Sequence, residues 1–242
     1  MTFAPKETLA VQVAQYVSEK IIRSEFKPGE KIQEEKLAEE LGVSRSPVRE
    51  SLRILEKARL VEVVPRHGAH VTAMTAAFVD YLFDILGELY ALGARRFAER
   101  STREDKERLQ DRTEQLIRAA EGGDALDYYQ AFIEYSRAGL QGAKNPLLEE
   151  MLLGDLDASM RRAEYEAVSI QVGNLKKNAE FFKRITKYSA QEADGEMAAK
   201  AVRAFFDHEK EYVLRNIKEK ERRTNGNSDS VQPTAEISFK RK

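Results

Sequence analysis

The chain has 242 residues, 42% of them hydrophobic and 33% charged, so it can bury a core beneath a strongly charged surface. Its formal net charge is −1, so any affinity for nucleic acid must come from a local basic patch. Cysteine is absent, which excludes disulfides, thiol catalysis and thiolate metal sites. No apolar run has the length of a membrane span and residues 1–5 lack a signal pattern, so we expect a soluble, cytoplasmic protein with no membrane partner.

The first 41 residues predict two short helices. Thr8 is a suitable cap for the first, whose apolar residues recur at helical spacing as far as Ile21 and which ends near Glu25. Residues 27–30, Lys-Pro-Gly-Glu, form a turn, and residues 32–41 are predicted as the second helix.

Residues 41–55 predict a helix-turn-helix. Gly42 supplies the left-handed conformation that ends one helix, and Ser46 and Pro47 suit the N-cap and first position of the next, which runs to about Ala58. Apolar residues at helical spacing face the core, and arginines spaced by four occupy the adjoining face: Val48, Leu52 and Leu55, and Arg45, Arg49 and Arg53. Hydroxyls and arginines at a helix start are typical of a helix that enters the DNA major groove. The alternative is a solvated arginine stripe on an ordinary helical hairpin.

A small β-hairpin is predicted next. The β-rich runs 60–64 and 69–72 flank Pro65-Arg66-His67-Gly68, and a hairpin after three helices completes a winged helix-turn-helix. Arg66 and His67 at the tip are candidates for DNA contact, and Gly68 allows the backbone to approach a phosphate closely. For His67 the alternative is a solvated turn residue.

From Thr75 the pattern becomes helical. We predict six helices, at residues 76–100, 102–121, 124–141, 145–171, 174–191 and 195–219. The predicted fold is therefore mainly α, with an N-terminal winged helix-turn-helix and a C-terminal all-α six-helix bundle. The domains are expected at 1–74 and 75–220, followed by a polar, disordered tail at 221–242.

Four motifs resemble a known family. LAEELGVSRSPVRESLRILEKARLV (37–61) and PRHGAHV (65–71) are similar to the signature of GntR-type bacterial transcription regulators. GAKNPLLEEML (142–152) and EADGEMAAKAVRAFF (192–206) resemble degenerate motifs of the FadR-type (FCD) effector domain, and six helices resemble its VanR-like subgroup. The resemblance implies a homodimer that binds a palindromic double-stranded DNA operator and responds to a small-molecule effector.

The resemblance also implies site residues. The positions that match those contacting the major groove are Ser44, Arg45, Ser46, Pro47 and Arg49, and His67 and Gly68 match the wing. Arg53 lies farther along the helix and is expected to contact the DNA backbone or to pair with Glu50 or Glu56. Glu35 stands where some relatives have a DNA-contacting arginine, so that contact is not expected here.

The metal site of many relatives is not matched. Their Asp and His positions correspond to Phe132, Ser136, Lys183 and Phe205, and the chain's three histidines are His67, His70 and His208. A site with several imidazole ligands cannot be assembled from these, so we expect no metal and no cofactor. The alternative set Asp127, Glu134, His208 and Glu209 is better explained as a solvated charged face.

The substituted positions suggest an organic effector instead. The expected lining comprises Leu86, Tyr90, Phe132, Ser136, Lys183 and Phe205. Aromatic walls with one hydroxyl and one ammonium suit an amphipathic or carboxylate ligand. In the alternative, phenylalanine side chains have closed the cavity and Lys183 lies at the surface.

The leading functional hypothesis is a ligand-responsive transcription regulator, in this family most often a repressor, whose effector lowers operator affinity. A winged interaction module without DNA binding is disfavoured by the three retained arginines. An enzyme is disfavoured because the chain has no nucleophile–base pair, no glycine-rich phosphate loop and no metal-spaced histidines.

Overall fold

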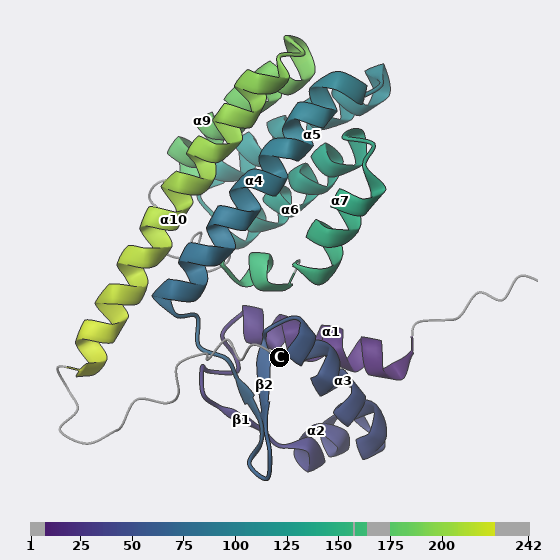
Figure 1. The fold of residues 1–242 in the computed structure, drawn as a ribbon, viewed down its shortest axis with the longest axis vertical. Helices are drawn as coiled ribbons and strands as arrows, with labels where there is room; N and C mark the ends of the chain where they lie inside the picture. The colour runs from purple at the N-terminus through teal and green to yellow at the C-terminus, as the bar shows by residue number, and fades with distance from the viewer. Residues whose placement is uncertain (1–7, 157, 164–174, 226–242) are drawn as a thin grey trace, which may run out of the picture.

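The computed structural model describes residues 8–156, 158–163 and 175–225. They form a winged part at the N-terminus and a helical bundle. Figure 1 draws the winged part below and the bundle above it. No helix among the described residues is both long and apolar enough to cross a membrane. The predicted fold class, mainly α with a winged helix-turn-helix and a helical bundle, is confirmed.

The three predicted N-terminal helices are present as α1 (Leu9–Ile22), α2 (Glu34–Leu41) and α3 (Arg45–Lys57). Gly42 ends α2 with a φ of 63°, as predicted, and the Val43 N–H donates to the Ala38 carbonyl at 3.0 Å. The predicted N-cap of α3 is wrong, because the cap is Ser44 rather than Ser46. Pro47 is tolerated inside the first turn because the N–H groups there have no partner within the helix.

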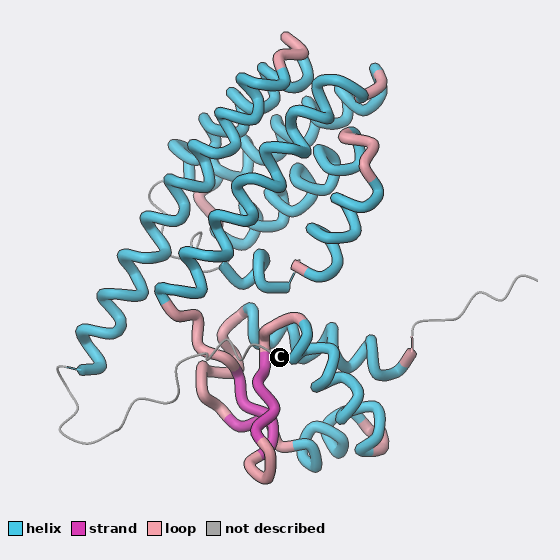
Figure 2. The backbone as a smooth tube through the Cα atoms, in the orientation of Figure 1, coloured by secondary structure: helices cyan, strands magenta, loops and turns pink. Residues whose placement is uncertain are grey.

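The wing is a three-stranded antiparallel sheet. The predicted hairpin is formed by β2 (Val61–Val64) and β3 (Gly68–Val71), with Val63 opposite Ala69. A third strand, β1 (Lys31–Ile32), pairs with the other edge of β3, giving the order β1-β3-β2 (Figure 2). Ile32 was predicted to begin the second helix. Two residues carry no detectable strand pattern, and Ile32 is instead buried opposite Ala69 in the sheet.

One apolar core holds the winged part together. It combines the inner faces of α1, α2 and α3 with the buried face of the sheet: Val13, Val17, Ile21, Ile32, Leu37, Val48, Leu52, Leu55, Leu60, Val61, Ala69 and Val71. Burying an apolar side chain of this size stabilises a fold by about 1.5–3 kcal/mol. The amphipathic spacing of these residues therefore sets the orientation of α3, with its arginines facing solvent.

The bundle is built around two long antiparallel helices, α4 (Ala76–Arg100) and α10 (Gly195–Asn225), which lie side by side in Figure 1. Beside them lie α5 (Arg103–Gly122), α6 (Ala125–Gly142) and α9 (Leu175–Thr186). α10 extends beyond the predicted end at 219, into the stretch 221–242 that composition assigns to a tail. Residues 226–242 of that predicted tail lie outside the described residues.

The predicted single helix 145–171 is wrong. The structure has α7 (Pro146–Glu150), a π-helical turn η1 (Met151–Asp155), a turn at Leu156 and a new helical stretch at 158–163. Gly154, a weak helix former, lies in the π-helical turn just before the interruption. A second π-helical turn, η3 (Lys187–Gln191), follows α9. The bundle therefore does not keep the predicted six helices, and residues 164–174 of this stretch lie outside the described part.

The helical stretch 158–163 joins the bundle to the winged part. The Ser159 hydroxyl donates to the carbonyl of Ala58, the residue that ends α3, at 2.9 Å. The Arg162 guanidinium donates to the hydroxyl and carbonyl oxygens of Thr72, just after β3, at 3.1 and 2.8 Å. Helix α3 and the wing are thus both bound to the same short segment of the bundle.

Candidate nucleic-acid interface and effector cavity

Helix α3 presents most of the predicted DNA-contacting residues to solvent. Val48, Leu52 and Leu55 are buried against the core, which turns the opposite face outward. Ser44, Ser46, Arg49 and Arg53 are exposed on that face and Pro47 is half-buried. The arrangement matches a recognition helix, whose N-terminal residues contact base edges in a major groove.

A surface groove brings the start of α3 next to the wing. It is lined by Lys31, Ile32, Gln33, Glu34, Glu35, Arg45, Arg66, His67 and Gly68. Four of these were predicted from sequence as DNA contacts, one from α3 and three from the wing. The other five come from β1 and the start of α2, and sequence analysis did not propose them as contacts.

The wing tip is shaped by two left-handed residues. Arg66 has a φ of 66° and Gly68 a φ of 92°, which together close the turn between β2 and β3. A Cβ at position 68 would lie 3.2 Å from Cε of Lys31, so glycine also keeps space for that lysine. Arg66 and His67 are exposed at the end of the hairpin.

Two arginines of α3 are bound to glutamates of α2. Arg45 forms an ion pair with Glu35, and Nε of Arg49 donates to Oε2 of Glu34 at 2.7 Å. The hydrogen bond that Arg49 donates to Glu34 raises the pKa of Arg49, so its guanidinium remains charged. Because the side chains are substantially exposed, these pairs contribute little to stability.

Arg53 differs from its two neighbours. The predicted pairing with Glu50 or Glu56 is not found in the described part of the chain. Glu56 instead accepts a hydrogen bond from the backbone N–H of Val63, at 3.2 Å, which ties α3 to the wing.

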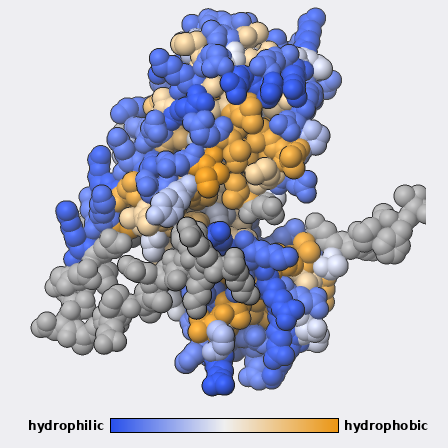
Figure 3. Space-filling model, viewed as in Figure 1, coloured by the Kyte–Doolittle hydropathy of each residue, from blue (hydrophilic) through white to orange (hydrophobic). Residues whose placement is uncertain are grey.

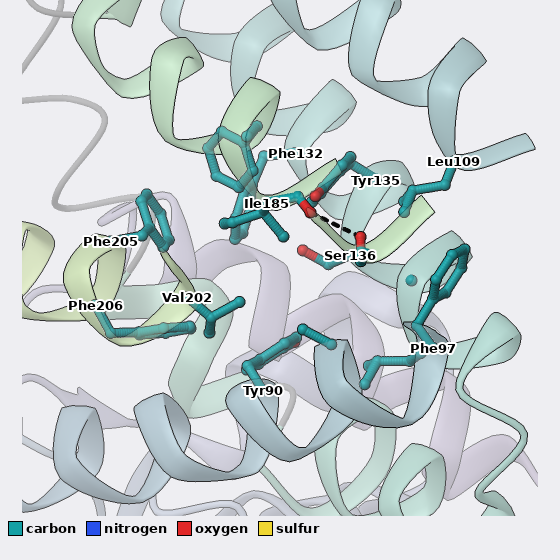
Figure 4. Close-up of a pocket in the computed structure, with 15 residues that line it drawn as sticks. Tyr90, Phe97, Leu109, Phe132, Tyr135, Ser136, Ile185, Val202, Phe205 and Phe206 are labelled. Carbon is teal, nitrogen blue, oxygen red and sulfur yellow. Dashed lines mark hydrogen bonds between the residues drawn. The ribbon is translucent and has the colours of Figure 1, made fainter. Parts of the chain in front are cut away.

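The bundle encloses a small, mainly apolar cavity of about 60 Å³ (Figure 4). Its lining comes from α4, α5, α6, α9, η3 and α10: Tyr90, Ala94, Phe97, Leu109, Phe132, Tyr135, Ser136, Gly139, Leu140, Phe182, Ile185, Ser189, Val202, Phe205 and Phe206. A volume of this size is well below the roughly 300–1,000 Å³ of sites for drug-sized ligands. The cavity in this state therefore fits only a very compact molecule.

Aromatic rings fill the space beside the cavity. The ring centroid of Phe182 lies 5.7 Å from that of Phe132 and 4.7 Å from that of Phe205. Tyr135 packs edge-on against Phe182 at 5.0 Å. On the far side, a Cβ at Gly142 would lie 2.2 Å from Cε2 of Phe97, so the glycine is what leaves room for that ring.

A few hydroxyl groups supply the polar part of the cavity. The Tyr135 phenol is hydrogen-bonded to the Thr186 hydroxyl at 3.2 Å, and burial raises the pKa of Tyr135, so the phenol is uncharged. The Ser189 hydroxyl donates to the Ile185 carbonyl at 2.7 Å. Figure 4 places Ser136 across the cavity from Tyr90, whose hydroxyl lies 2.8 Å from the sulfur of Met160.

Comparison with known families identifies both parts. The model of the bacterial regulatory proteins of the gntR family matches residues 9–71, and the FCD domain model matches residues 81–208, more than half of the chain. The chain is a GntR-family regulator with an FCD domain. It is therefore a DNA-binding transcription regulator and not an enzyme.

Several relatives of this GntR-family regulator carry similar descriptions. It is 28% identical over 207 residues to YdhC, an uncharacterized HTH-type transcriptional regulator of Bacillus subtilis, covering 82% of this chain and 88% of that protein. The gluconate operon transcriptional repressor of Bacillus licheniformis is 34% identical over 80 residues, about a third of each chain (33% and 32%). The structure of Escherichia coli McbR/YncC has the same fold, with a TM-score of 0.74 and 22% identity over 87% of this chain and 99% of that one.

The FCD domain places most, but not all, of the predicted effector residues at the cavity. Tyr90, Phe132, Ser136 and Phe205 line it. Leu86 is fully buried in the bundle core but does not line the cavity. Lys183 is also outside it, exposed on a neighbouring surface groove, where its ammonium pairs with Glu180 at 2.5 Å.

The helix that carries Lys183 does not stay α-helical as far as Asp194. The π-helical turn η3 lies between them and holds one residue more than an α-helical turn. The residue at the interior position is Phe182, one place earlier, and no ammonium lines the cavity in the part of the chain that the structure describes.

The four positions that sequence analysis matched to metal ligands of relatives carry two phenyl rings, a hydroxyl and an ammonium: Phe132, Ser136, Lys183 and Phe205. Among the described residues, no group of three or more His, Cys, Asp or Glu side chains could hold a metal ion. The alternative set is dispersed: Glu134 pairs with Arg137 at 3.9 Å, and Glu209 accepts a hydrogen bond from Asn178 at 2.9 Å. His208 lies against the ring of Phe181, with centroids 5.1 Å apart.

Proposed function

We propose that this GntR-family regulator is a repressor that binds a palindromic operator as a homodimer and is released by a small organic effector bound in the bundle cavity. The observation that carries the proposal is the contact between the cavity and the winged part. Tyr90 lines the cavity and touches Met160, and Met160 belongs to the stretch 158–163 that holds α3 and the wing. Repression is favoured by the similarity to the gluconate operon repressor.

Exposed apolar side chains on the bundle favour a homodimer. Tyr81 and Ile85 of α4 are 52% and 51% exposed, and Leu147 of α7 is 66% exposed. Figure 3 shows apolar residues gathered on this face of the bundle, over α4 and the helices beside it. Such surfaces on a soluble protein commonly mark an interface, and a two-fold pair of bundles would present two recognition helices to a palindrome.

The lining selects the effector by charge. The described lining of the cavity has aromatic walls and hydroxyl groups but no cationic side chain, because Lys183 lies outside it. A carboxylate buried there would remain without a counter-charge, which is costly. The effector proposed here is therefore a compact, uncharged aromatic or apolar molecule with one hydrogen-bonding group, rather than the carboxylate expected from sequence.

Release follows from differential binding. A ligand that enters between Tyr90 and the aromatic cluster would displace Tyr90, whose hydroxyl contacts Met160 of segment 158–163. If it binds more tightly to the arrangement with weaker operator affinity, it shifts the population toward that arrangement.

The experiment compares 4-methylphenol with 4-methylbenzoate. At pH 7 the phenol is expected to raise the Tm and to lower the affinity for DNA from upstream of the gene, measured by fluorescence anisotropy. The benzoate, of similar shape but charged, is expected to do neither. At a ligand concentration of about 100 times Kd the stabilisation would be about 2.7 kcal/mol.

Ser136→Leu, which fills the cavity, should abolish the response to the phenol while leaving DNA binding intact. Stabilisation by the benzoate alone would indicate an anionic effector and the Lys183 groove. A response to neither compound would contradict a compact aromatic ligand.

A cytoplasmic location is part of the same proposal, whereas membership of the VanR-like subgroup is not retained in it. The subgroup was inferred from six helices, and the interruption at Leu156 removes that support. The cytoplasmic location is favoured by the DNA-binding role of the gntR family.

A further inference from the structure

The glutamates that begin α2 face the arginines that begin α3. Oε2 of Glu34 accepts from Nε of Arg49 at 2.7 Å, and Glu35 is paired with Arg45. The contacts join the first turn of α2 to the first two turns of α3, so two cationic side chains of the recognition helix are paired with carboxylates in the DNA-free protein. Glu35 and Arg45 also line the groove that continues to Arg66 and His67 of the wing.

The two pairs are not needed to hold the helices together. Leu37 and Ala38 of α2 and Val48 and Leu52 of α3 are buried in the common core. The ion-paired side chains lie outside it, with exposed fractions of 64% for Glu35 and 63% for Arg49. Exposed pairs of this kind add little to folding stability. Their position points to a role in binding.

Two carboxylates in a DNA-binding groove oppose contact with phosphates. A phosphate offers only acceptors and a negative charge, so it attracts the arginines but repels Glu34 and Glu35. A G·C pair differs, because guanine presents acceptors at O6 and N7 while its cytosine presents an N4 amino donor. An arginine with an adjacent carboxylate can match that edge, because the guanidinium donates to guanine O6 and N7 and the carboxylate accepts from the cytosine N4 amino group.

We propose that Glu34 and Glu35 are specificity-determining residues of this DNA interface. They keep Arg45 and Arg49 paired on unselected DNA, where contacts to the backbone predominate, and they release them where a base edge satisfies both the guanidinium and the carboxylate. The glutamates thus weaken non-specific binding more than operator binding. The recognised feature is a G·C pair in the major groove opposite the start of α3.

The test is Glu34→Gln combined with Glu35→Gln in the full-length protein. An operator is first selected with the wild-type protein from a random duplex library, and a random-sequence duplex of the same length is the non-specific probe. The double variant is expected to bind the random duplex about 10-fold more tightly at low salt. Each arginine released to a phosphate steepens the salt dependence, log K against log salt, by about 0.9.

The ratio of operator to random-duplex affinity should fall at the same time, and a new selection with the variant should lose a G·C preference. Glu39→Gln is the matched control, because Glu39 is exposed on the same helix and no ion pair joins it to the described part of the chain. It should change the random-duplex affinity less than twofold. Far-ultraviolet circular dichroism and Tm verify that each variant is folded.

The control removes one negative charge and the double variant two. The proposal is therefore overturned if the control tightens random-duplex binding by about threefold or more, half of the expected effect on a logarithmic scale, since general charge would then explain the result. It is also overturned if the operator-to-random ratio is unchanged or rises. The wild-type selection is independent of these outcomes, so a failure of DNA binding itself would be recognised separately.

Discussion

At the level of single residues, the side chains on the buried face of α3 decide where its arginines point. The spacing of Val48, Leu52 and Leu55 determines which way the helix turns, and therefore leaves Arg49 outward. The pairing of Arg49 with Glu34 depends on the approach of two helices, which no local pattern contains. Arg53 was expected to contact the DNA backbone or to pair with Glu50 or Glu56; the described residues do not show that pairing, and the backbone contact stays a prediction.

Arg49→Ala should weaken operator binding by about 1 kcal/mol or more. The slope of log K against log salt should become shallower by at most about 0.9, the contribution of one phosphate contact. The loss follows from removing an exposed cation at the start of the recognition helix. Anisotropy titrations over a salt series measure both quantities.

Arg103→Ala serves as the control, because that arginine is 93% exposed and lies in the bundle. It should leave operator affinity unchanged, and neither variant should alter the oligomeric state measured by sedimentation. Wild-type operator affinity in Arg49→Ala would show that the recognition helix docks differently.

At the level of elements, helices marked by their own caps and breaks were predicted correctly. Elements that depend on pairing with a distant segment were not predicted. The helices α4, α5 and α6 were predicted because their caps and breaks are local, such as Thr102 before α5. Strand β1 was missed, since Lys31 and Ile32 become a strand only through pairing with β3. The π-helical turns were missed because they preserve the apolar pattern while changing the register.

The start of α5 is fastened to the turn after α6 by one buried carboxylate. Asp105 accepts hydrogen bonds from the Thr102 N–H at 2.9 Å and from the Lys144 ammonium at 2.7 Å. Burial alone would raise the pKa of Asp105. The Lys144 ammonium and the Thr102 donors outweigh it and lower the pKa to about 2.

Asp105→Asn should therefore destabilise the protein by about 2 kcal/mol at pH 7, the equivalent of the lowered pKa. Because the folded-state pKa lies below the ordinary value of 3.8, this stabilisation is present above about pH 4 and is lost as the pH falls toward 2. Urea denaturation at pH 7 and pH 3 measures the difference, which should be smaller at pH 3.

Asp127→Asn, at an exposed position in the first turn of α6, should show no comparable pH dependence. A loss of stability in Asp105→Asn that is equal at both pH values would assign the effect to packing rather than to charge.

At the level of the whole molecule, segment 158–163 is the link between the two cores. Arg161 forms an ion pair with Glu19 of α1, and Arg162 binds Thr72 after the wing, while Met160 is buried in the bundle. The sequence predicted a helix here, but nothing in a helical pattern indicates contacts with residues about 90 to 140 positions away.

Arg162→Ala should loosen this link. Arg162 is 8% exposed, and its loss leaves the Thr72 oxygens without that donor, at a cost of about 1.5–3 kcal/mol. In differential scanning calorimetry the winged part is expected to unfold in a separate transition below that of the bundle. Arg103→Ala should keep the wild-type profile, and a wild-type profile in Arg162→Ala would mean that the two parts are held together by other contacts.

The π-helical turn η3 also affects how this chain should be aligned with its relatives. One residue inserted into an α-helix can be accommodated as a π-helical turn such as η3. The helix before the insertion then keeps its orientation, and only the residue numbers shift. Counting with a one-position gap inside residues 187–191 would match Phe182, rather than Lys183, to the ligand position of relatives. Three phenylalanines and a serine, Phe132, Ser136, Phe182 and Phe205, all of which line the cavity, would then stand at the four matched positions.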